Sequence, residues 1–257
     1  MDKPRDPSVV AIIQARMGSS RLPGKVLMPI GGEPMLYRVV VRARRAKMVG
    51  MVVVATTTDP SDDPVAAFCR ERGFPCFRGD PMDVLDRYYQ AALNFKAATV
   101  VRLTADCPLI DPNEIDRTIK AFFDSNVDFA ANRLPPPWER TTPIGMDTEV
   151  VTFNALARAW QEADKKYERE HVMPYLYDEA GRFRILLVDH EPDIGHLRLT
   201  VDTVEDLMLI RKIYQNFNNA DDFSWPDILM LLEKHPEYLQ INANIPHKLF
   251  TDVDERL

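Results

Sequence analysis

Three cationic side chains fall within ten residues of one another near the start of the chain: Arg16, Arg21 and Lys25. The residues between them favour exposed backbone N–H groups and add hydroxyl donors, because they include Gly18, Ser19 and Ser20. Arginine suits planar oxyanions and lysine supplies a compact charge, so this composition predicts a phosphate-binding loop. The alternative is a solvated basic loop, since all of these residue types are common in loops.

The loop differs from two familiar phosphate-binding motifs. A P-loop has four residues between its glycines and a serine or threonine after its lysine. Here five residues separate Gly18 from Gly24, and Val26 follows Lys25. The Rossmann pattern GxGxxG is absent as well. The loop does leave the end of an apolar run, residues 9–13, which is where open parallel sheets bind ligands.

Two aspartates are candidate ligands for a divalent metal ion. Asp106 follows the run TVVRLT and Asp202 follows LRLTV, so each is expected at the carboxyl end of a strand. Carboxylate oxygens suit a hard cation such as Mg²⁺. Each also has a purely structural interpretation. Asp106 can form a turn before Pro108, and Asp202 can cap a helix with Glu205 completing a capping box.

The scaffold that must position these residues follows from the alternation of short β-branched runs with helical patterns. We expect strands at 9–13, 51–57, 75–77, 99–104 and 127–132. Between them we expect helices at 34–47, 62–73, 83–95 and 112–125. This alternation predicts an α/β fold with a Rossmann-like, mostly parallel sheet flanked by helices.

The pattern changes at RLPPPWERTTPIG, where three consecutive prolines exclude a regular helix or a central strand. We expect a small excursion lobe over residues 133–150. After it, the sequence predicts a strand at 148–153, two helices reaching 177, and strands at 182–189 and 197–201. Helices at 203–217 and 225–234 then follow.

Composition excludes several classes of protein. The 257 residues carry a net charge of −7, so no overall nucleic-acid-binding surface is expected. The three cysteines have no CxxC spacing, which disfavours zinc, and their odd number fits a reducing cytoplasm. No apolar run approaches the roughly 20 residues that span a bilayer, and no signal peptide is evident. We expect a cytoplasmic protein without membrane insertion.

Six stretches, in order along the chain, resemble one known group of enzymes: IIQARMGSSRLPGKVLMPIGGEPML, FRGDPMDVLDRYYQAA, VVRLTADCPLID, GMDTEVVTFNALARAW, YEREHVMPYLY and LRLTVDTVEDL. The group is the cytidylyltransferases of sugar activation. The chain most resembles the spore coat polysaccharide biosynthesis cytidylyltransferase family, which is related to the CMP-sialic acid and CMP-KDO synthetases. Gln14 stands where sialate and KDO synthetases usually carry proline, so the exact sugar does not transfer.

The resemblance implies a nucleotidyltransferase that couples CTP to a sugar, for example a nonulosonic acid, and releases pyrophosphate for surface polysaccharide biosynthesis. It also implies a fold of the nucleotide-diphospho-sugar transferase type, Mg²⁺ as cofactor and a homodimer. A domain over residues 8–215 would include the excursion, and residues 216–257 would form a helical extension packed on it. The base and the acceptor stay open, since another NTP or another small sugar fits the same residues.

The resemblance assigns roles to particular residues. Arg16 and Lys25 would be catalytic, and Asp106 and Asp202 would bind the metal. The nucleotide would contact Ala15, Arg16, Gly18, Ser19, Ser20, Arg21, Lys25, Asp86, Arg87, Arg102 and Asp106. The sugar would lie near Asp147, Glu149, Glu170 and His171.

Several of these residues have alternatives that the sequence leaves open. The pair Asp86-Arg87 lies near a helix start, where such residues also stabilise the helix. Arg102 shares a strand face with Asp106, so it can meet a phosphate or pair with that aspartate. Asp147 can simply cap a turn, and His171 can be a packed residue or a dimer contact.

Two other functions also remain open at this stage. A glycosyltransferase that uses a nucleotide-sugar donor commonly shows Asp-x-Asp after a central strand, whereas this chain has a single aspartate in TADCP. A non-catalytic subunit would bind the nucleotide without releasing pyrophosphate.

Overall fold

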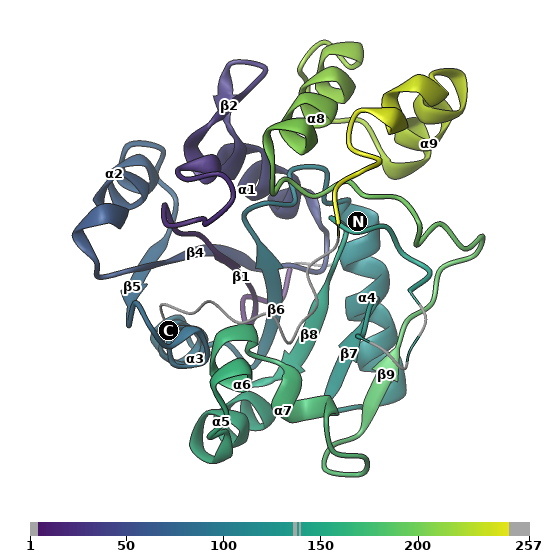
Figure 1. Ribbon diagram of the computed structural model, residues 1–257. Helices are drawn as coiled ribbons and strands as arrows, with labels where there is room; N and C mark the ends of the chain where they lie inside the picture. Colours follow the sequence, from purple (N-terminus) through teal and green to yellow (C-terminus); the bar gives the residue numbers. More distant parts are fainter. Residues whose placement is uncertain (1–4, 136–137, 139, 247–257) are drawn as a thin grey trace.

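The computed structural model describes residues 5–135, 138 and 140–246, and its centre is a seven-stranded sheet (Figure 1). The strand order is β5-β4-β1-β6-β8-β7-β9. The strands are β1 (Val9–Gln14), β4 (Met51–Thr57), β5 (Cys76–Gly79), β6 (Thr99–Thr104), β7 (Phe129–Ala131), β8 (Glu149–Thr152) and β9 (Ile185–Leu187). A separate two-stranded ribbon pairs β2 (Pro29–Ile30) with β3 (Glu33–Pro34).

The predicted mostly parallel sheet is confirmed. Strand β1 pairs in parallel with β4 and β6, β4 with β5, and β7 with β9. Only β8 among the described strands of this sheet runs against its neighbours, β6 and β7. Strand β8 therefore brings its first residue, Glu149, to the edge where β1 and β6 end.

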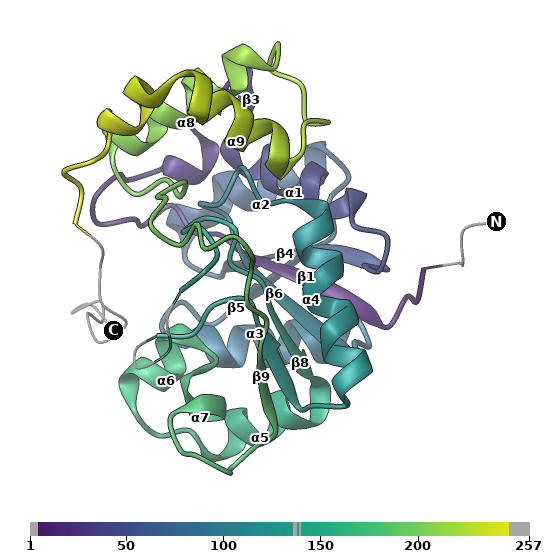
Figure 2. The same ribbon diagram turned by 90° about the vertical axis from the view of Figure 1, so that its right-hand side faces the viewer.

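Helices cover both faces of the sheet, as the alternating sequence predicts. They are α1 (Met35–Arg45), α2 (Asp63–Glu71), α3 (Val84–Asn94), α4 (Pro112–Ser125), α5 (Phe153–Glu162), α6 (Lys166–His171), α7 (Pro174–Tyr177), α8 (Val204–Asn216) and α9 (Trp225–Lys234). Short 3-10 turns occur at η1 (Lys25–Leu27), η2 (Pro60–Asp62) and η3 (Pro236–Gln240). Helices α1, α2 and α4 pack in the apolar core on one face of the sheet, and α3, α5 and α7 pack in the core on the other face. Figure 2 shows α4 and α5 on opposite sides of the sheet.

The burial pattern of β1 explains why its sequence is apolar throughout. Alternate residues point to opposite faces of a strand. Accordingly Val10 and Ile12 belong to the core on the α3 side, whereas Ala11 and Ile13 belong to the core on the α1 side. All four are fully buried, which is typical of a strand in the middle of a parallel sheet.

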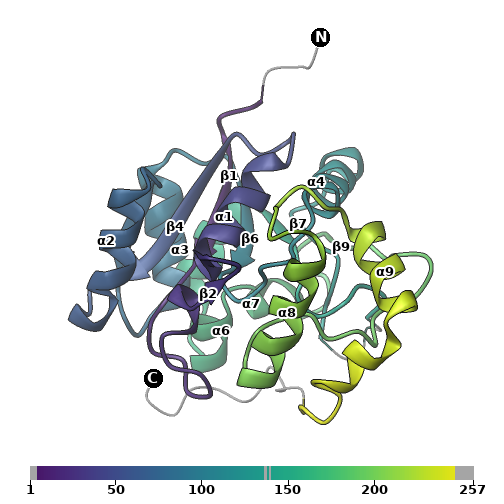
Figure 3. The ribbon, with the colours of Figure 1, turned by 90° about the horizontal axis from the view of Figure 1, so that it is seen from above.

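A third apolar cluster joins the C-terminal helices to the rest of the fold. Helices α8 and α9 pack there against Leu22, Ile30, Met35 and Leu109. Figure 3 shows α8 beside the β2–β3 ribbon, and Arg211 of α8 donates to the Pro29 carbonyl at 2.9 Å. The predicted division at residue 215 stays a prediction, and its residues 247–257 lie outside the described part of the chain, as do 136, 137 and 139 of the predicted excursion.

Two local predictions were wrong. The run 197–201 was expected to form a strand, but among the described residues it contributes only an isolated parallel bridge between Arg198 and Ile144. The region after β8 holds three short helices rather than two, because Ala163 and Val172 interrupt the helical path; Val172 has a positive φ of 73°.

The bridge at Arg198 depends on a close approach of two backbones. Gly145 has φ +108°, and a Cβ added there would lie 2.5 Å from the carbonyl carbon of Leu199. Leu199 donates its N–H to the carbonyl of Ile144 at 2.7 Å, and Ile144 donates to Leu197 at 3.0 Å. Only glycine combines this φ with the missing side chain, so Gly145 attaches the excursion to the segment that leads to Asp202.

Candidate active site

The loop after β1 is fixed by its own backbone. Gly24, in the left-handed conformation with φ +74°, donates to the carbonyl of Met17 at 2.8 Å, and Ser19 donates to the same carbonyl at 2.9 Å. The N–H of Met17 donates to Asp62 of η2 at 2.6 Å. These contacts close the loop into a compact turn, which delivers Lys25 to the start of η1.

A cavity of about 260 Å³ opens at the edge where β1 and β6 end. Six of the residues predicted from the loop line it, namely Ala15, Arg16, Ser19, Ser20, Arg21 and Lys25. Five predicted residues from elsewhere in the chain line it too: Arg87, Asp106, Glu170, His171 and Asp202. Segments distant in sequence therefore meet at one concave site, as the strand order requires.

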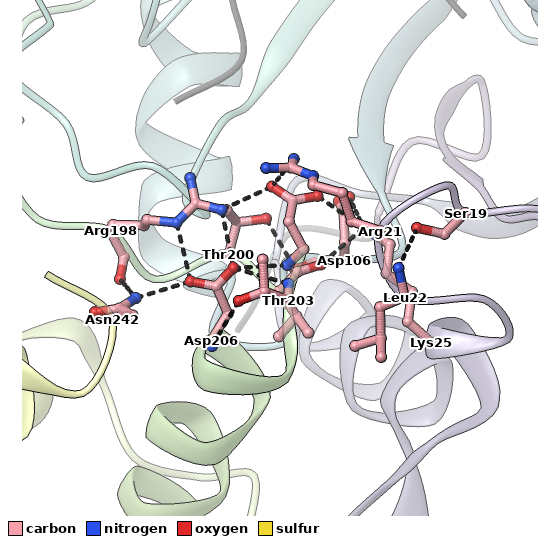
Figure 4. A network of polar contacts seen from close by, with 12 residues as sticks. Ser19, Arg21, Leu22, Lys25, Asp106, Arg198, Thr200, Thr203, Asp206 and Asn242 are labelled. Atoms are coloured by element: carbon pink, nitrogen blue, oxygen red, sulfur yellow. Dashed lines mark hydrogen bonds and ion pairs between the residues drawn. The ribbon is translucent and has the colours of Figure 1, made fainter. Parts of the chain in front are cut away.

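Lys25 lies at the centre of the polar contacts in this site (Figure 4). Its ammonium donates to Asp106 Oδ2 at 2.8 Å and to Asp202 Oδ1 at 2.9 Å. It also donates to the carbonyl of Val201 at 2.7 Å. The predicted meeting of the cationic loop with two carboxylates from distant segments is confirmed as geometry, whereas the roles of these residues remain predictions.

The charges in this cluster stabilise one another. Burial disfavours the charged form of Lys25, but Asp106 and Asp202 more than offset this, so the pKa of Lys25 is raised. Burial likewise opposes the charge of Asp202, yet Lys25 and Arg21 bring the pKa of Asp202 down to about 2. Lys25 and Asp202 are therefore both charged at neutral pH.

Asp202 is held from the other side by an arginine that sequence reasoning missed. Arg21 and Arg198 both reach Asp202 Oδ2 at 2.8 Å. Arg198 also binds the fully buried Asp206 in a bidentate manner: its Nε donates to Oδ1 and its Nη2 donates to Oδ2, each at 2.9 Å. The sequence does place this arginine four residues before Asp202. That signal was not used, because the run around Arg198 was interpreted as a strand.

The last member of this network comes from far along the chain. Asn242 donates to Asp206 Oδ1 at 2.9 Å and to the carbonyl of Arg198 at 3.1 Å, and it is buried. No sequence signal marks this asparagine. Figure 4 shows Asn242, Asp206 and Arg198 in the same network of polar contacts as Lys25 and Asp106.

The structural alternative for Asp202 was wrong in its details. The residue that caps α8 is Thr203, and Asp206 rather than Glu205 completes the capping box. Asp206 also accepts from the backbone N–H of Asp202 at 2.9 Å. Asp202 is thus oriented by the cap without being the cap, which leaves its carboxylate for the cavity.

Arg102 and Glu149 were predicted to contact nucleotide and sugar, but the structure pairs them with each other. They lie in register on β6 and β8 and form a short ion pair whose side chains are 14% and 8% exposed. Arg102 also donates to Gln14 Oε1 at 3.2 Å. The alternative pairing of Arg102 with Asp106 is not formed: Arg102 binds Glu149, and Lys25 binds Asp106. Neither residue lines the cavity.

Three more predicted residues lie outside the cavity lining, namely Gly18, Asp86 and Asp147. Asp86 accepts from the indole N–H of Trp160 at 2.8 Å, so it joins α3 to α5. Asp147 binds Arg140 at 2.7 Å. Burial opposes its charge, but Arg140 and other arginines lower the pKa of Asp147.

Helices α3 and α6 also contribute to the wall of the cavity. Arg87 is buried and donates to the carbonyl of Asp80 at 3.0 Å, and burial lowers the pKa of Arg87. Helix α6 is attached to α3 by an ion pair between Arg169 and Asp83, the N-cap of α3. This attachment places the last two residues of α6, Glu170 and His171, at the cavity.

The donor set fits a hard divalent cation that also binds a ligand. Within residues 5–135, 138 and 140–246, no group of three or more His, Cys, Asp or Glu side chains could hold a metal by itself. However, Asp106 Oδ2, Asp202 Oδ1 and the Val201 carbonyl all lie within 2.9 Å of one point, the lysine nitrogen. Mg²⁺ is typically bound by one or two carboxylates together with phosphate oxygens, which is the chemistry offered here.

Comparisons with known proteins agree with the geometry. The family model described as "Cytidylyltransferase" matches residues 10–237. The chain is 34% identical over 237 residues to the spore coat polysaccharide biosynthesis protein SpsF of Bacillus subtilis, covering 89% of this chain and 95% of that protein. It is 40% identical over 249 residues to a 3-deoxy-manno-octulosonate cytidylyltransferase of Mesorhizobium japonicum, covering 81% of this chain and all of that protein.

A solved structure is similar over nearly the whole chain. It is a cytidylyltransferase from Leptospira borgpetersenii, with a TM-score of 0.85, 34% identity, and coverage of 93% of this chain and 99% of that one. The part of the chain that the structure describes contains no helix long and apolar enough to cross a membrane. The family match, the shared fold and the cluster around Lys25 lead to one conclusion: the chain belongs to the cytidylyltransferase family of nucleotidyltransferases.

Proposed function

We propose that this protein couples CTP to a hydroxyl group of an acidic sugar, such as a nonulosonic acid, and releases a CMP-sugar and pyrophosphate for surface polysaccharide biosynthesis. The observation that supports this most directly is the meeting of the basic loop with Asp106 and Asp202 around Lys25. Cations for a triphosphate and carboxylates for its metal ion then lie in one cavity. The names of the SpsF and 3-deoxy-manno-octulosonate relatives support a sugar as acceptor.

The reaction is a displacement at the α-phosphorus. The acceptor hydroxyl oxygen forms a bond to that phosphorus and releases its proton to solvent, the bond to the β-phosphate oxygen breaks, and pyrophosphate leaves with the electron pair. Catalysis of such a step is mainly alignment and stabilisation of charge. Arg16, Arg21 and the loop N–H groups would orient the triphosphate, and Lys25 would offset the charge that develops on the leaving group.

Asp106 and Asp202 would hold Mg²⁺. When bound, the ion polarises the phosphate and lowers the pKa of a nearby hydroxyl. The chain's own contribution is to fix the two carboxylates, which Arg198 and Asp206 do for Asp202. Thr200 donates its hydroxyl to the Asp106 carbonyl at 3.1 Å, which ties the two metal-binding segments together.

The acceptor would approach from the α6 side of the cavity. Glu170 and His171 line that wall and can bind sugar hydroxyls or a carboxylate. The pairs Arg102–Glu149 and Arg140–Asp147 would support this region from behind, near the ends of β6 and β8. Under this proposal these two ion pairs help to position the acceptor and do not contact the nucleotide.

The test is a grid of four nucleoside triphosphates against sugar acids, amino sugars and neutral sugars, read by pyrophosphate release in the presence of Mg²⁺. We expect pyrophosphate only with CTP and with one class of sugar acid, and a CMP-sugar of the matching mass. Release of nucleoside diphosphate from a nucleotide-sugar would instead indicate a glycosyltransferase. Binding of CTP without pyrophosphate for any acceptor would indicate a non-catalytic subunit.

We further propose that the enzyme acts in the cytoplasm as a homodimer. The three cysteines, Cys69, Cys76 and Cys107, are free thiols in the structure, which agrees with a reducing compartment. Light scattering after size-exclusion chromatography distinguishes a dimer from a monomer, because one chain has a mass of 29.4 kDa.

A further inference from the structure

The ammonium of Lys25 has no hydrogen-bond donor left in the described structure. An ammonium carries three N–H donors. All three are used, on Asp106 Oδ2, the Val201 carbonyl and Asp202 Oδ1, at 2.7–2.9 Å. In this position Lys25 cannot also bind a phosphate oxygen, so a catalytic role for Lys25 requires that it exchange at least one of these partners.

Asp202 can offer a metal ion only the carboxylate oxygen that already faces the lysine. Oδ2 of Asp202 already accepts from Arg21 and Arg198, both at 2.8 Å. Oδ1 of Asp202 accepts from Lys25 at 2.9 Å, and that contact points toward Asp106. A cation that binds Asp202 therefore competes with the lysine nitrogen for Oδ1, since the two arginines occupy Oδ2.

We propose that Lys25 is an internal competitor for the metal site: it neutralises the two aspartates until a metal ion and a triphosphate bind together, and it then moves to the triphosphate. This proposal rests on the function proposed above. Its chemical basis is charge. Exchange of an ammonium for a divalent ion, with the ammonium released into the cavity, adds two positive charges there, and a polyanion must be present to compensate them.

The side chain of Lys25 is suited to such a movement. Lysine has four flexible methylene groups and a single charge that needs no fixed orientation, unlike the planar fork of arginine. The backbone of Lys25 is held by η1 and by the N–H contact of Gly24, so only the side chain has to change position. The residue is 7% exposed, so the move is into the adjoining cavity that Lys25 lines.

The proposal predicts an unusual direction of effect for a catalytic residue. Lys25→Met keeps an unbranched side chain that is one atom shorter and removes its charge, so the variant should lose turnover but bind the metal ion more tightly without nucleotide. We expect the dissociation constant for Mn²⁺ alone to fall at least about tenfold. The reason is that the variant lacks the positive charge of the ammonium, whose repulsion of the metal ion is strong at a partly buried site. Mn²⁺ is the probe because it accepts the same oxygen ligands and is visible by electron paramagnetic resonance.

The matched controls separate a local from a general effect. Lys47→Met removes a charge from an exposed lysine just beyond the C-terminal end of α1. It should leave Mn²⁺ binding unchanged. The double variant Lys25→Met with Asp106→Asn should lose the gained affinity, which would show that the metal is at this site. Thermal unfolding verifies that each variant is folded, and Lys25→Gln is the replacement if Lys25→Met does not fold.

CTP provides the second half of the test. In the wild type, CTP without acceptor should increase the affinity for Mn²⁺ by a larger factor than in Lys25→Met, because linkage between the two ligands passes through the lysine. Equal or weaker Mn²⁺ binding in a folded Lys25→Met protein overturns the proposal while leaving the proposed function intact. Absence of Mn²⁺ binding in the wild type even with CTP, and in the variant, overturns the metal site itself and the proposal with it.

Discussion

Glu149→Gln provides the sharpest test of where the structure departs from the sequence prediction. The substitution keeps the shape of the side chain and removes its charge, which leaves Arg102 without its carboxylate. Both side chains are largely buried, at 14% and 8% exposure. Burial disfavours the charge of Arg102, but Glu149 more than compensates, so the pKa of Arg102 is raised above its ordinary value.

Loss of one partner of a buried ion pair typically costs about 3–5 kcal/mol. Arg102 keeps a contact with Gln14 at 3.2 Å, and the new amide can still accept one hydrogen bond, so we expect the lower end, about 3 kcal/mol. For a chain of this size that corresponds to a fall in Tm of about 6–12 °C. Urea unfolding followed by circular dichroism measures the free energy, and thermal unfolding measures Tm.

Two controls make the experiment decisive. Asp124→Asn removes an exposed pair with Lys120, with side chains 62% and 68% exposed, and should cost less than about 0.5 kcal/mol. The double variant Arg102→Met with Glu149→Leu should recover most of the stability, because an apolar pair of similar volume can replace a buried ion pair. A Glu149→Gln protein of normal stability with a raised KM for the sugar would refute the structural role and restore the sugar-binding prediction.

Three further results are expected. Asp106→Asn and Lys25→Ala should each remain folded and lose at least about a hundredfold in turnover, measured by pyrophosphate release, as is typical when one electrostatic contact to the transition state is removed; near-normal turnover in either contradicts its role. Asp202 has a pKa lowered from 3.8 to about 2, so the unfolded state binds its proton first as the pH falls. Its contribution of about 2 kcal/mol is therefore present above about pH 4 and lost toward pH 2, and urea midpoints of Asp202→Asn should show a correspondingly weaker pH dependence. Asn242→Ala should cost about 1–2 kcal/mol through two lost hydrogen bonds, whereas the exposed Asn244→Ala should cost almost nothing; equal costs would show that the Asp206 contact is unimportant.

The centre of the site was predictable because it depends on a general property of parallel sheets. Strand β1 and strand β6 are parallel, so their ends and the residues that follow, including Lys25 and Asp106, had to lie at the same edge. Asp202 reached that edge although its preceding run is not a strand, because the bridge between Arg198 and Ile144 holds it there. The prediction was thus right about the meeting point and wrong about the element.

The pairing of Arg102 with Glu149 was not predictable from sequence. It requires β8 to insert between β6 and β7 in the opposite direction, with a register that places these two residues side by side. Local periodicity contains no information about strand order. The same limit applies to Asn242, whose partner Asp206 is distant in sequence and whose surroundings carry no pattern of their own.

The crossing of Gly145 and Leu199 has an implication for how this enzyme changes its acceptor during evolution. Since the two main chains touch with no side chain between them, a shift of either segment must drag the other along. Under the proposed function the acceptor lies on this side of the site, so lengthening or tilting the stretch around residue 145 to fit another acceptor would misplace Asp202 and impair the chemistry. New acceptors are therefore expected to arise by exchange of side chains on a stationary backbone, and variants of this chain with altered acceptor preference should keep a glycine at position 145.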